Sequence, residues 1–438
     1  MKLHILFSHT HAMNRPVILV TGANAGLGLG VCERLLIQLS STMPSDSGML
    51  DDPRHNVAST PFHASEGCTL LLACRNQVKA REAVAQLESL LHRLSTTDEE
   101  YLEKHGIPAP AQKNTQPATA SAPALAASTL SSASSSAIDM SSTSSLRHRD
   151  MTTSRLNSPL DQRTREARKM YRTSFCKGTV IEVVPLDLAS LESTKACART
   201  ISAKVPYLTH VILNAGGAAW LGVDWLKATW EILTNLHKAV TLPSFKLQRS
   251  GDKSSDDLGW VWQINAAGHY VLTKELEPLL CASPYATPSR VIWTGSLEAN
   301  EADFHAQDIQ CLDPHTSPRP YESTKYQCEL LALGMDQRYT SSRQPHMPRA
   351  YTAHPGIVAT SIFSGVIPAI MMVLMKLVFY LVRISPTCLF DGLYSMNYAL
   401  TLTSSLSRQD SHFRRIIQST RTKARLPRPL WLWPLLST

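Results

Sequence analysis

The most constraining feature of this sequence is a glycine-rich turn that joins a short apolar run to a helical pattern. Residues 16–20 (Pro-Val-Ile-Leu-Val) are typical of a buried strand, and residues 27–39 are typical of a helix. Between them, residues 21–28 read Thr-Gly-Ala-Asn-Ala-Gly-Leu-Gly. Glycines there let the backbone approach a pyrophosphate, whose charge the helix N-terminus favours. A glycine-rich turn is often only a tight turn, so its place between a strand and a helix is what favours a nucleotide site.

The same alternation of buried strand and helix recurs along the chain. It predicts further strands at 69–73, 179–184, 210–213 and 290–294, and further helices at 193–205, 259–280 and 321–339. Such alternation predicts a parallel sheet covered on both faces, which is an α/β, doubly wound, Rossmann-like fold. The length of 438 residues suggests about three domains. We expect one domain over residues 15–390 instead, because insertions account for the excess length.

Three stretches depart from this alternation. Residues from about 95 to 172 lack apolar periodicity and contain a run dominated by Ala, Ser and Thr, so a disordered insertion is predicted there. Residues 230–258 are rich in Lys, Ser and Asp, and are predicted to form a second inserted loop near the substrate side. The tail at 391–438 matches no pattern that we recognise.

Composition excludes several classes of protein. With 43% hydrophobic and 18% charged residues the chain is not wholly disordered. The net charge of +8 is concentrated in residues 146–177 and 408–428, which are solvated segments or contacts to an anionic surface. Neither has the interleaved aromatics of a nucleic-acid module, so no nucleic-acid partner is expected. Nine widely spaced cysteines without CxxC predict free thiols in a reducing compartment, and no metal site.

Residues 362–384 form a long apolar stretch in which only Lys376 and Arg383 are charged. The stretch is long enough to span a bilayer. Because Pro368 and Lys376 interrupt it, a membrane-embedded hairpin or an interfacial helix fits at least as well as a span. The alternative is a buried helix pair. We expect membrane contact.

The end of the second strand favours one form of nicotinamide cofactor. NAD sites usually carry an acidic residue there to hold the ribose 2′-hydroxyl, but Ala73-Cys74-Arg75-Asn76 has none. Arg75 is placed to pair with a 2′-phosphate, which predicts NADP(H). The alternative is a surface arginine that caps a loop.

A Tyr-x-x-x-Lys motif, Tyr321 to Lys325, carries the chemistry. The i, i+4 spacing places both side chains on one face of the predicted helix. We expect the ammonium to lower the phenol pKa from about 10 towards neutrality, which would make Tyr321 a general acid. Alone, the motif favours an ordinary surface pair, because it occurs often by chance.

Other motifs follow the strands in a fixed order. Ser296 lies just after a predicted strand, and Asn265 lies within a predicted helix. Together with the glycine turn, this series resembles the short-chain dehydrogenase/reductase family over about residues 15–361, apart from the insertions. The remaining motifs of the series are Asp187-Leu188, Asn214-Ala215-Gly216, and Pro355-Gly356 with Thr360.

This resemblance implies a role for each matching position. Ser296 would hydrogen-bond the substrate carbonyl, and Tyr321 would give it a proton as hydride arrives. Lys325 would hold the nicotinamide ribose and bias Tyr321, while Asn265 would hold a water for proton resupply. The implied cofactor-binding residues are Gly22, Gly26, Leu27, Gly28, Arg75, Asp187, Leu188, Asn214, Ala215, Gly216, Tyr321, Lys325, Pro355, Gly356, Val358 and Thr360.

A narrower resemblance comes from residues 304–310 (Phe-His-Ala-Gln-Asp-Ile-Gln) and 319–325 (Arg-Pro-Tyr-Glu-Ser-Thr-Lys). These motifs resemble the fungal 3-keto-sterol reductases of sterol C-4 demethylation. The resemblance implies NADPH-dependent reduction of the 3-ketone of a 4-methyl sterol at the endoplasmic reticulum membrane, with the catalytic domain facing the cytosol. Its implied partners are a sterol ketone substrate, the membrane surface and other enzymes of the demethylation. Two alternatives stay open: another lipophilic ketone as substrate, or a non-catalytic dinucleotide-binding scaffold.

Overall fold

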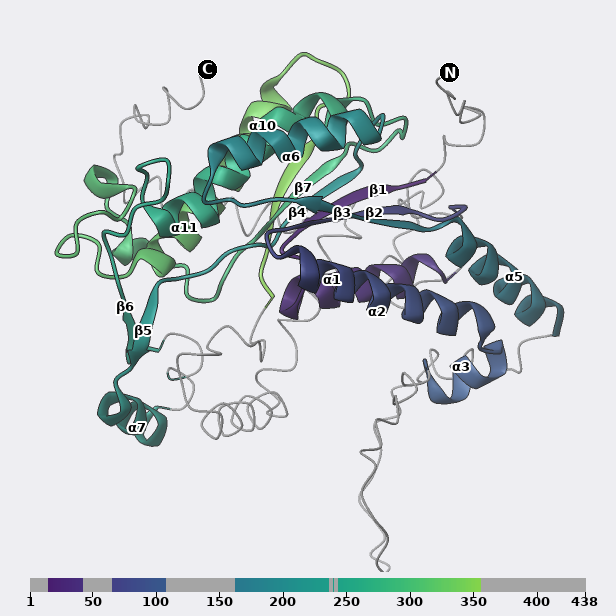
Figure 1. Cartoon of the computed structure of the whole chain (residues 1–438), viewed down its shortest axis with the longest axis horizontal. Coiled ribbons are helices and arrows are strands. Elements are labelled where there is room, and N and C mark those ends of the chain that lie inside the picture. Colours follow the sequence, from purple (N-terminus) through teal and green to yellow (C-terminus); the bar gives the residue numbers. More distant parts are fainter. Residues whose placement is uncertain (1–14, 42–64, 108–161, 236–238, 240–242, 356–438) are drawn as a thin grey trace, which may run out of the picture.

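The structure is a computed structural model that describes residues 15–41, 65–107, 162–235, 239 and 243–355 (Figure 1). The apolar stretch at 362–384 and the tail at 391–438 lie outside these residues. So do three predicted cofactor-binding residues, Gly356, Val358 and Thr360. In the part of the chain that is described, no helix is long and apolar enough to cross a membrane.

The centre of the molecule is a six-stranded sheet whose strands all run parallel (Figure 1). Its order is β3-β2-β1-β4-β7-β8. The direction of winding reverses beside β1, and such a switch point opens a crevice at the carboxyl ends of the strands. The predicted doubly wound α/β fold is confirmed. The strands are β1 (Val17–Thr21), β2 (Thr69–Cys74), β3 (Val180–Pro185), β4 (His210–Leu213), β7 (Arg290–Thr294) and β8 (Arg349–Ala353).

Helices cover both faces of this sheet (Figure 1). One face is covered by α6 (Leu191–Lys204), α10 (Gly268–Cys281) and α11 (Pro320–Ser341). The other is covered by α1 (Gly26–Leu39), α2 (Gln77–Thr96) and α5 (Gln162–Gly178). Successive residues of a strand alternate between the two cores, as Ile18 and Leu19 do, so both are buried. This explains why the strands read as continuous apolar runs in the sequence.

The predicted helix at 259–280 is interrupted near its start. It begins as α9 (Trp260–Trp262), widens into the π-helical turn η3 (Gln263–Ala267) and continues as α10. Asn265 lies within the π-helical turn and is buried. Such turns are frequent at functional sites, because the extra residue redirects nearby side chains and backbone groups.

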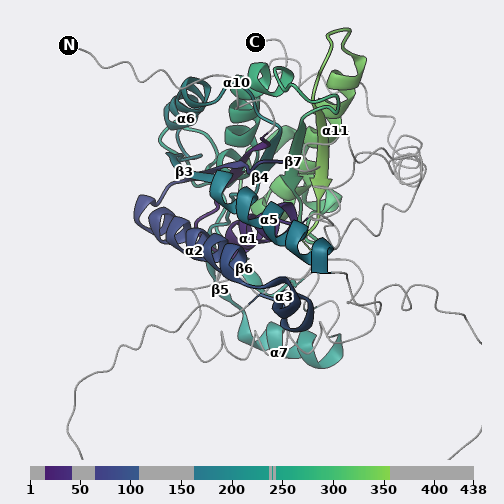
Figure 2. The same ribbon diagram turned by 90° about the vertical axis from the view of Figure 1, so that its right-hand side faces the viewer.

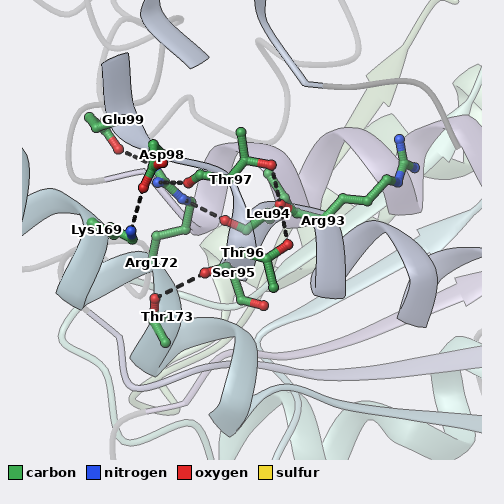
Figure 3. A network of polar contacts seen from close by, with 10 residues as sticks. All are labelled: Arg93, Leu94, Ser95, Thr96, Thr97, Asp98, Glu99, Lys169, Arg172 and Thr173. Atoms are coloured by element: carbon green, nitrogen blue, oxygen red, sulfur yellow. Dashed lines mark hydrogen bonds and ion pairs between the residues drawn. The ribbon is translucent and has the colours of Figure 1, made fainter. Parts of the chain in front are cut away.

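The prediction of a disordered insertion over 95–172 is wrong at both of its ends. Residues 99–105 form helix α3 (Glu99–His105), and α5 begins at residue 162. Figure 2 shows α5 alongside α2, with α3 near the C-terminal end of α2. The buried Arg172 of α5 donates to the carbonyls of Leu94 (2.8 Å) and Thr97 (3.1 Å) and pairs with Glu99 (Figure 3). These tertiary partners order a basic segment that has no apolar periodicity of its own.

The prediction of a simple inserted loop at 230–258 is also wrong in part. Strands β5 (Trp220–Val223) and β6 (Lys246–Gln248) pair in an antiparallel hairpin, which carries helix α7 (Trp225–Thr234). Figure 1 shows this hairpin extending from the sheet towards α7. The Glu231 carboxylate of α7 accepts a hydrogen bond from the backbone N–H of Ser244 (3.1 Å), which joins the two sides of the hairpin. Short strands paired in this way leave no clear period in the sequence.

Candidate functional site

The predicted site residues gather at one edge of the sheet, because all six strands end there. The glycine turn follows β1, Arg75 follows β2, and Asn214 follows β4. Ser296 lies two residues after β7, and Pro355 lies two residues after β8. Two short 3-10 turns, η4 (Glu301–Asp303) and η5 (Ala306–Asp308), lead from the Ser296 loop to α11.

Two glycines of the turn are required by close backbone contacts. Gly22 has a φ of +68°, and a Cβ there would lie 2.9 Å from the Cα of Ala215. A Cβ on Gly28 would lie 2.5 Å from Nδ2 of Asn214 and would collide with the carbonyl of Gly22. The turn is thus packed directly against the residues that follow β4.

The N-terminus of α1 is open for an anion. Its N-cap residue, Ala25, has no side chain that can accept from the first backbone N–H groups, and the first turn holds no acidic residue. Gly26, with a φ of +55°, begins the helix, and Leu27 packs into the core below it. Free N–H groups and the positive end of the helix dipole are what a pyrophosphate requires.

Thr21 joins the glycine turn to the strand beside it. Its Oγ1 accepts hydrogen bonds from the backbone N–H groups of Asn214 and Ala215, both at 2.9 Å. The same atom lies 3.0 Å from Nε2 of His269. The sequence analysis quoted Thr21 in the glycine-rich motif without giving it a role, and it missed His269, which belongs to no motif.

His269 extends this network to the π-helical turn. Its Nδ1 lies 3.1 Å from the backbone carbonyl of Asn265, which can only accept, so Nδ1 carries the proton. Burial lowers the pKa of His269 to about 4. The ring is therefore neutral at pH 7, and Nε2 accepts from the Thr21 hydroxyl.

Asn265 is held by its neighbours on three sides. Its Nδ2 donates to the carbonyl of Gly217 (2.8 Å) and to Oγ1 of Thr324 (3.1 Å), and its Oδ1 accepts from the Gly217 N–H (2.9 Å). A Cβ on Gly216 would lie 2.5 Å from the same Oδ1 and 3.7 Å from Nζ of Lys325. The glycine predicted at 216 therefore makes room for two other predicted site residues.

Ser296, Tyr321 and Lys325 meet beside this group. The Ser296 hydroxyl lies close enough to the Tyr321 phenol to oppose the rise of the phenol pKa. Ser296 Oγ also accepts from the backbone N–H of Glu298 (3.1 Å). The Nζ of Lys325 donates to the carbonyl of Thr294 (3.0 Å) and lies 5.8 Å from the centroid of the Tyr321 ring. The structure thus brings together all four residues of the predicted tetrad.

The expectation for the phenol pKa is wrong for the protein alone. Burial and the nearby Glu298 carboxylate raise the pKa of Tyr321 above its usual value, although the hydrogen bond from Ser296 opposes them. Burial also lowers the pKa of Lys325. A helical Tyr-x-x-x-Lys spacing shows that the ammonium is near, but it does not show how much water the phenol has lost.

The remaining described residues that were predicted to bind the cofactor also follow strands at this edge of the sheet. Arg75 is exposed at the end of β2, directly before the N-cap of α2. The Asp187 carboxylate accepts from the N–H of Ala189 (3.0 Å) within its own turn, and Leu188 is buried. Pro355 is the last residue before the chain leaves the described part.

The hairpin supplies three site neighbours that the sequence analysis did not predict. The ring of Trp220 lies 5.6 Å from that of Tyr321. The Nζ of Lys246 lies 4.7 Å from the centroid of the Trp220 ring, and Oε1 of Gln248 accepts from the N–H of Tyr321 (3.1 Å). No spacing signal could have found these residues, because they lie far from Tyr321 in the chain and belong to no motif.

The fold and the site together match the pattern of short-chain dehydrogenases/reductases: a doubly wound sheet, a glycine turn after β1, and Asn, Ser, Tyr and Lys at its carboxyl edge. Comparison with known proteins finds similar sequences among the 3-keto-steroid reductases. The 3-keto-steroid reductase erg27 of Aspergillus fumigatus is 27% identical over 376 residues, which cover 79% of this chain and 63% of that protein. The 3-keto-steroid reductase erg27 of Schizosaccharomyces pombe is 30% identical over 204 residues, 47% of this chain and 57% of that protein.

The chain thus spans less than two thirds of the length of these curated relatives. No family profile matches it. Among solved structures, a short chain dehydrogenase from Salmonella enterica is 14% identical over 82% of both chains, with a TM-score of 0.37. The predicted resemblance to 3-keto-sterol reductases is confirmed by the curated relatives.

Proposed function

We propose that this protein reduces the 3-ketone of a 4-methyl sterol to the 3-hydroxyl with NADPH, in ergosterol-type sterol biosynthesis. The observation that carries the proposal is the meeting of Ser296, Tyr321 and Lys325 beside Asn265, at the edge where the glycine turn lies. The names of the fungal relatives support a 3-keto steroid as the substrate class.

The residues of the crevice fit a dinucleotide. Gly22 and Gly28 let the turn pack closely against the residues that follow β4, and the uncapped N-terminus of α1 faces the same edge. Arg75 is exposed after β2, where a 2′-phosphate would lie, and it forms no ion pair with the described residues. NADPH, when bound, supplies the hydride.

The protein's own residues handle the proton. The Ser296 hydroxyl, which lies beside the phenol, is placed to bond a ketone oxygen. The phenol of Tyr321 gives its proton to that oxygen. Its raised pKa keeps it protonated at neutral pH, which suits an acid, and the Lys325 ammonium stabilises the phenolate that forms. Asn265 is placed to hold a water through which the proton is replaced.

We further propose that the reaction takes place at the endoplasmic reticulum membrane, with the catalytic domain facing the cytosol. A sterol partitions into lipid, so the apolar stretch at 362–384 would serve as its path of entry. Other enzymes of sterol C-4 demethylation are the expected partners, since they make the ketone and use the alcohol.

The test is turnover of a 4-methyl 3-keto sterol by the full chain in microsomes, with NADPH and NADH side by side. Activity with NADPH that is lost in Tyr321→Phe, while NADPH binding is kept, supports the reaction and the acid together. A folded, NADPH-binding protein that leaves the sterol unchanged would contradict the substrate. It would favour another lipophilic ketone or, if no carbonyl is reduced, a scaffold.

A second variant tests the cofactor. Arg75→Glu removes the expected partner of the 2′-phosphate and adds a repulsive charge, so NADPH binding should weaken far more than NADH binding. Equal weakening of both would contradict the assignment of Arg75. Lys79→Glu, which changes a neighbouring exposed cation on α2, is the matched control.

A further inference from the structure

Two ammonium groups flank the ring of Tyr321. One belongs to Lys325, one turn along the same helix, and its Nζ lies 5.8 Å from the ring centroid. The other belongs to Lys246 of β6, and its Nζ also lies 5.8 Å from that centroid. Lys246 lies closer still to Trp220, which packs against the same ring.

The two lysines differ in what balances their charge. Lys246 forms an ion pair with Glu298, and its side chain is only 4% exposed while that of Glu298 is 22% exposed. Lys325 donates to the neutral carbonyl of Thr294, and among the described residues no carboxylate lies within ion-pair distance of it. One cation beside the phenol is therefore balanced and the other is not.

The balancing carboxylate is also part of the serine loop. Glu298 lies two residues after Ser296 and donates its backbone N–H to the serine Oγ (3.1 Å), and the hydroxyl of that serine lies beside the phenol. From the same strand as Lys246, Gln248 accepts from the Tyr321 N–H (3.1 Å) and donates to Glu322 (2.5 Å). Strand β6 therefore contacts both the serine loop and the start of α11.

We propose that Lys246 and Glu298 act as a positioning pair for Tyr321: the hairpin lays a second ammonium against the catalytic phenol, and Glu298 cancels its charge, so that only Lys325 favours the phenolate. The proposal rests on the role of Tyr321 in the proposed function and deepens it. Neither residue takes part in the reaction. Each acts on the phenol through its charge and through the ion pair that joins β6 to the serine loop.

The proposal predicts that removing the two charges one at a time shifts the Tyr321 pKa in opposite directions. The other charged or titratable groups around the phenol are Lys325, Glu322 and Cys328, which the variants leave in place. Glu298→Gln leaves the Lys246 ammonium without its ion-pair partner and with only the Glu322 carboxylate to oppose it, which favours the phenolate and lowers the Tyr321 pKa. Lys246→Met leaves the Glu298 carboxylate unbalanced, which raises it. At these separations each shift is about one unit.

The experiment places a ring-fluorinated tyrosine at position 321 of the full chain and follows its ionisation by fluorine NMR. Fluorination makes the phenol more acidic and brings its titration towards the pH range in which the protein stays folded. Wild type, Lys246→Met, Glu298→Gln and the double variant are compared. We expect the two single variants to titrate on opposite sides of wild type, with the double variant returning towards it.

A purely structural role would not produce this pattern. Shifts of the same sign in both single variants, or no shift, would overturn the proposal. Lys246→Arg keeps the cation and should titrate close to wild type. Glu99→Gln, which breaks the other buried ion pair far from the site, should leave the titration of Tyr321 unchanged.

Two further arrangements keep the test decisive. If Lys246→Met does not fold, Glu298→Gln must still titrate about one unit below the double variant, which holds no unbalanced charge. The NMR reading needs no substrate, so it separates the two proposals. Opposite shifts in a protein that leaves the sterol unchanged would contradict only the proposed function, and unchanged titrations in an active enzyme would contradict only the pair.

Discussion

The two insertions of this chain contact the same sheet at different places and have different consequences. The first ends in α5, which packs along α2 on the face away from the tetrad and is held by the buried Arg172 (Figure 3). The second folds as the β5–β6 hairpin and lays Trp220, Lys246 and Gln248 against Tyr321. In sequence, both depart from the alternation of buried strand and helix that the rest of the chain follows. From their places in the fold we expect the first insertion to affect stability and the second to affect the proposed reaction.

The largest effect is expected in the first insertion. Arg172→Met leaves the Glu99 carboxylate without its partner in a largely buried position and removes donors from the carbonyls of Leu94 and Thr97. Chemical denaturation should show a loss of about 3–5 kcal/mol in the free energy of unfolding. The kcat and KM of the folded fraction should not change.

Lys169→Met is the matched control for this variant, because the Lys169–Asp98 pair is exposed. It should cost far less than Arg172→Met, because water screens an exposed pair. A fall in kcat for folded Arg172→Met would break the comparison, since it would connect the first insertion to the chemistry.

The next largest effect is expected at His269, which lies in neither insertion. The pKa of His269 is about 4 in the folded protein and about 6.5 when unfolded, so the unfolded chain binds the proton more tightly. Stability should therefore fall as the pH drops below about 6.5, by about 3 kcal/mol by pH 4 from this residue alone. Urea midpoints at pH 7, 5.5 and 4.5 measure the loss.

His269→Gln should flatten that part of the pH dependence, and the buried His210, whose pKa burial also lowers, should account for a further part. Variants in either insertion should keep the acid sensitivity of wild type. A His269→Gln protein that is as acid-sensitive as wild type would show that the loss arises elsewhere.

A smaller effect is expected in the hairpin. Gln248→Ala removes the acceptor of the Tyr321 N–H and the donor to Glu322. The kcat/KM for a reducible ketone should fall about tenfold, which corresponds to roughly 1–2 kcal/mol, with little change in Tm. Gln86→Ala, which loses an exposed bond to Glu33 on the other face, is the control. Equal activity of the two variants would remove the distinction between the insertions.

The smallest effect is expected at the far end of the hairpin. Leu226 of α7 is 87% exposed, so Leu226→Ser should change the free energy of unfolding by no more than about 0.5 kcal/mol. Turnover in detergent should match wild type. A drop in turnover would extend the functional part of the hairpin from β5 and β6 to α7.

The strands and the long helices could be predicted from the sequence because their signal is local. A run such as Val17–Val20 is apolar at every position, since both faces of the parallel sheet are buried. Strand β8 and the hairpin were missed, because short strands with mixed burial leave no clear period. The ends of the first insertion were missed because Arg172 of α5 finds its partners across the fold, in residues 94–99.

The sequence by itself determined the α/β class and the glycine turn, because strand ends, helix spacing and turn chemistry are properties of neighbouring residues. The four tetrad positions were predicted through the family resemblance. Only the tertiary structure decided that His269 joins Thr21 to Asn265, that burial raises the Tyr321 pKa, and that a second lysine lies over that ring. These depend on desolvation and on charges brought within a few ångströms from distant parts of the chain. The desolvation and the short distances between charges arise only when the chain folds.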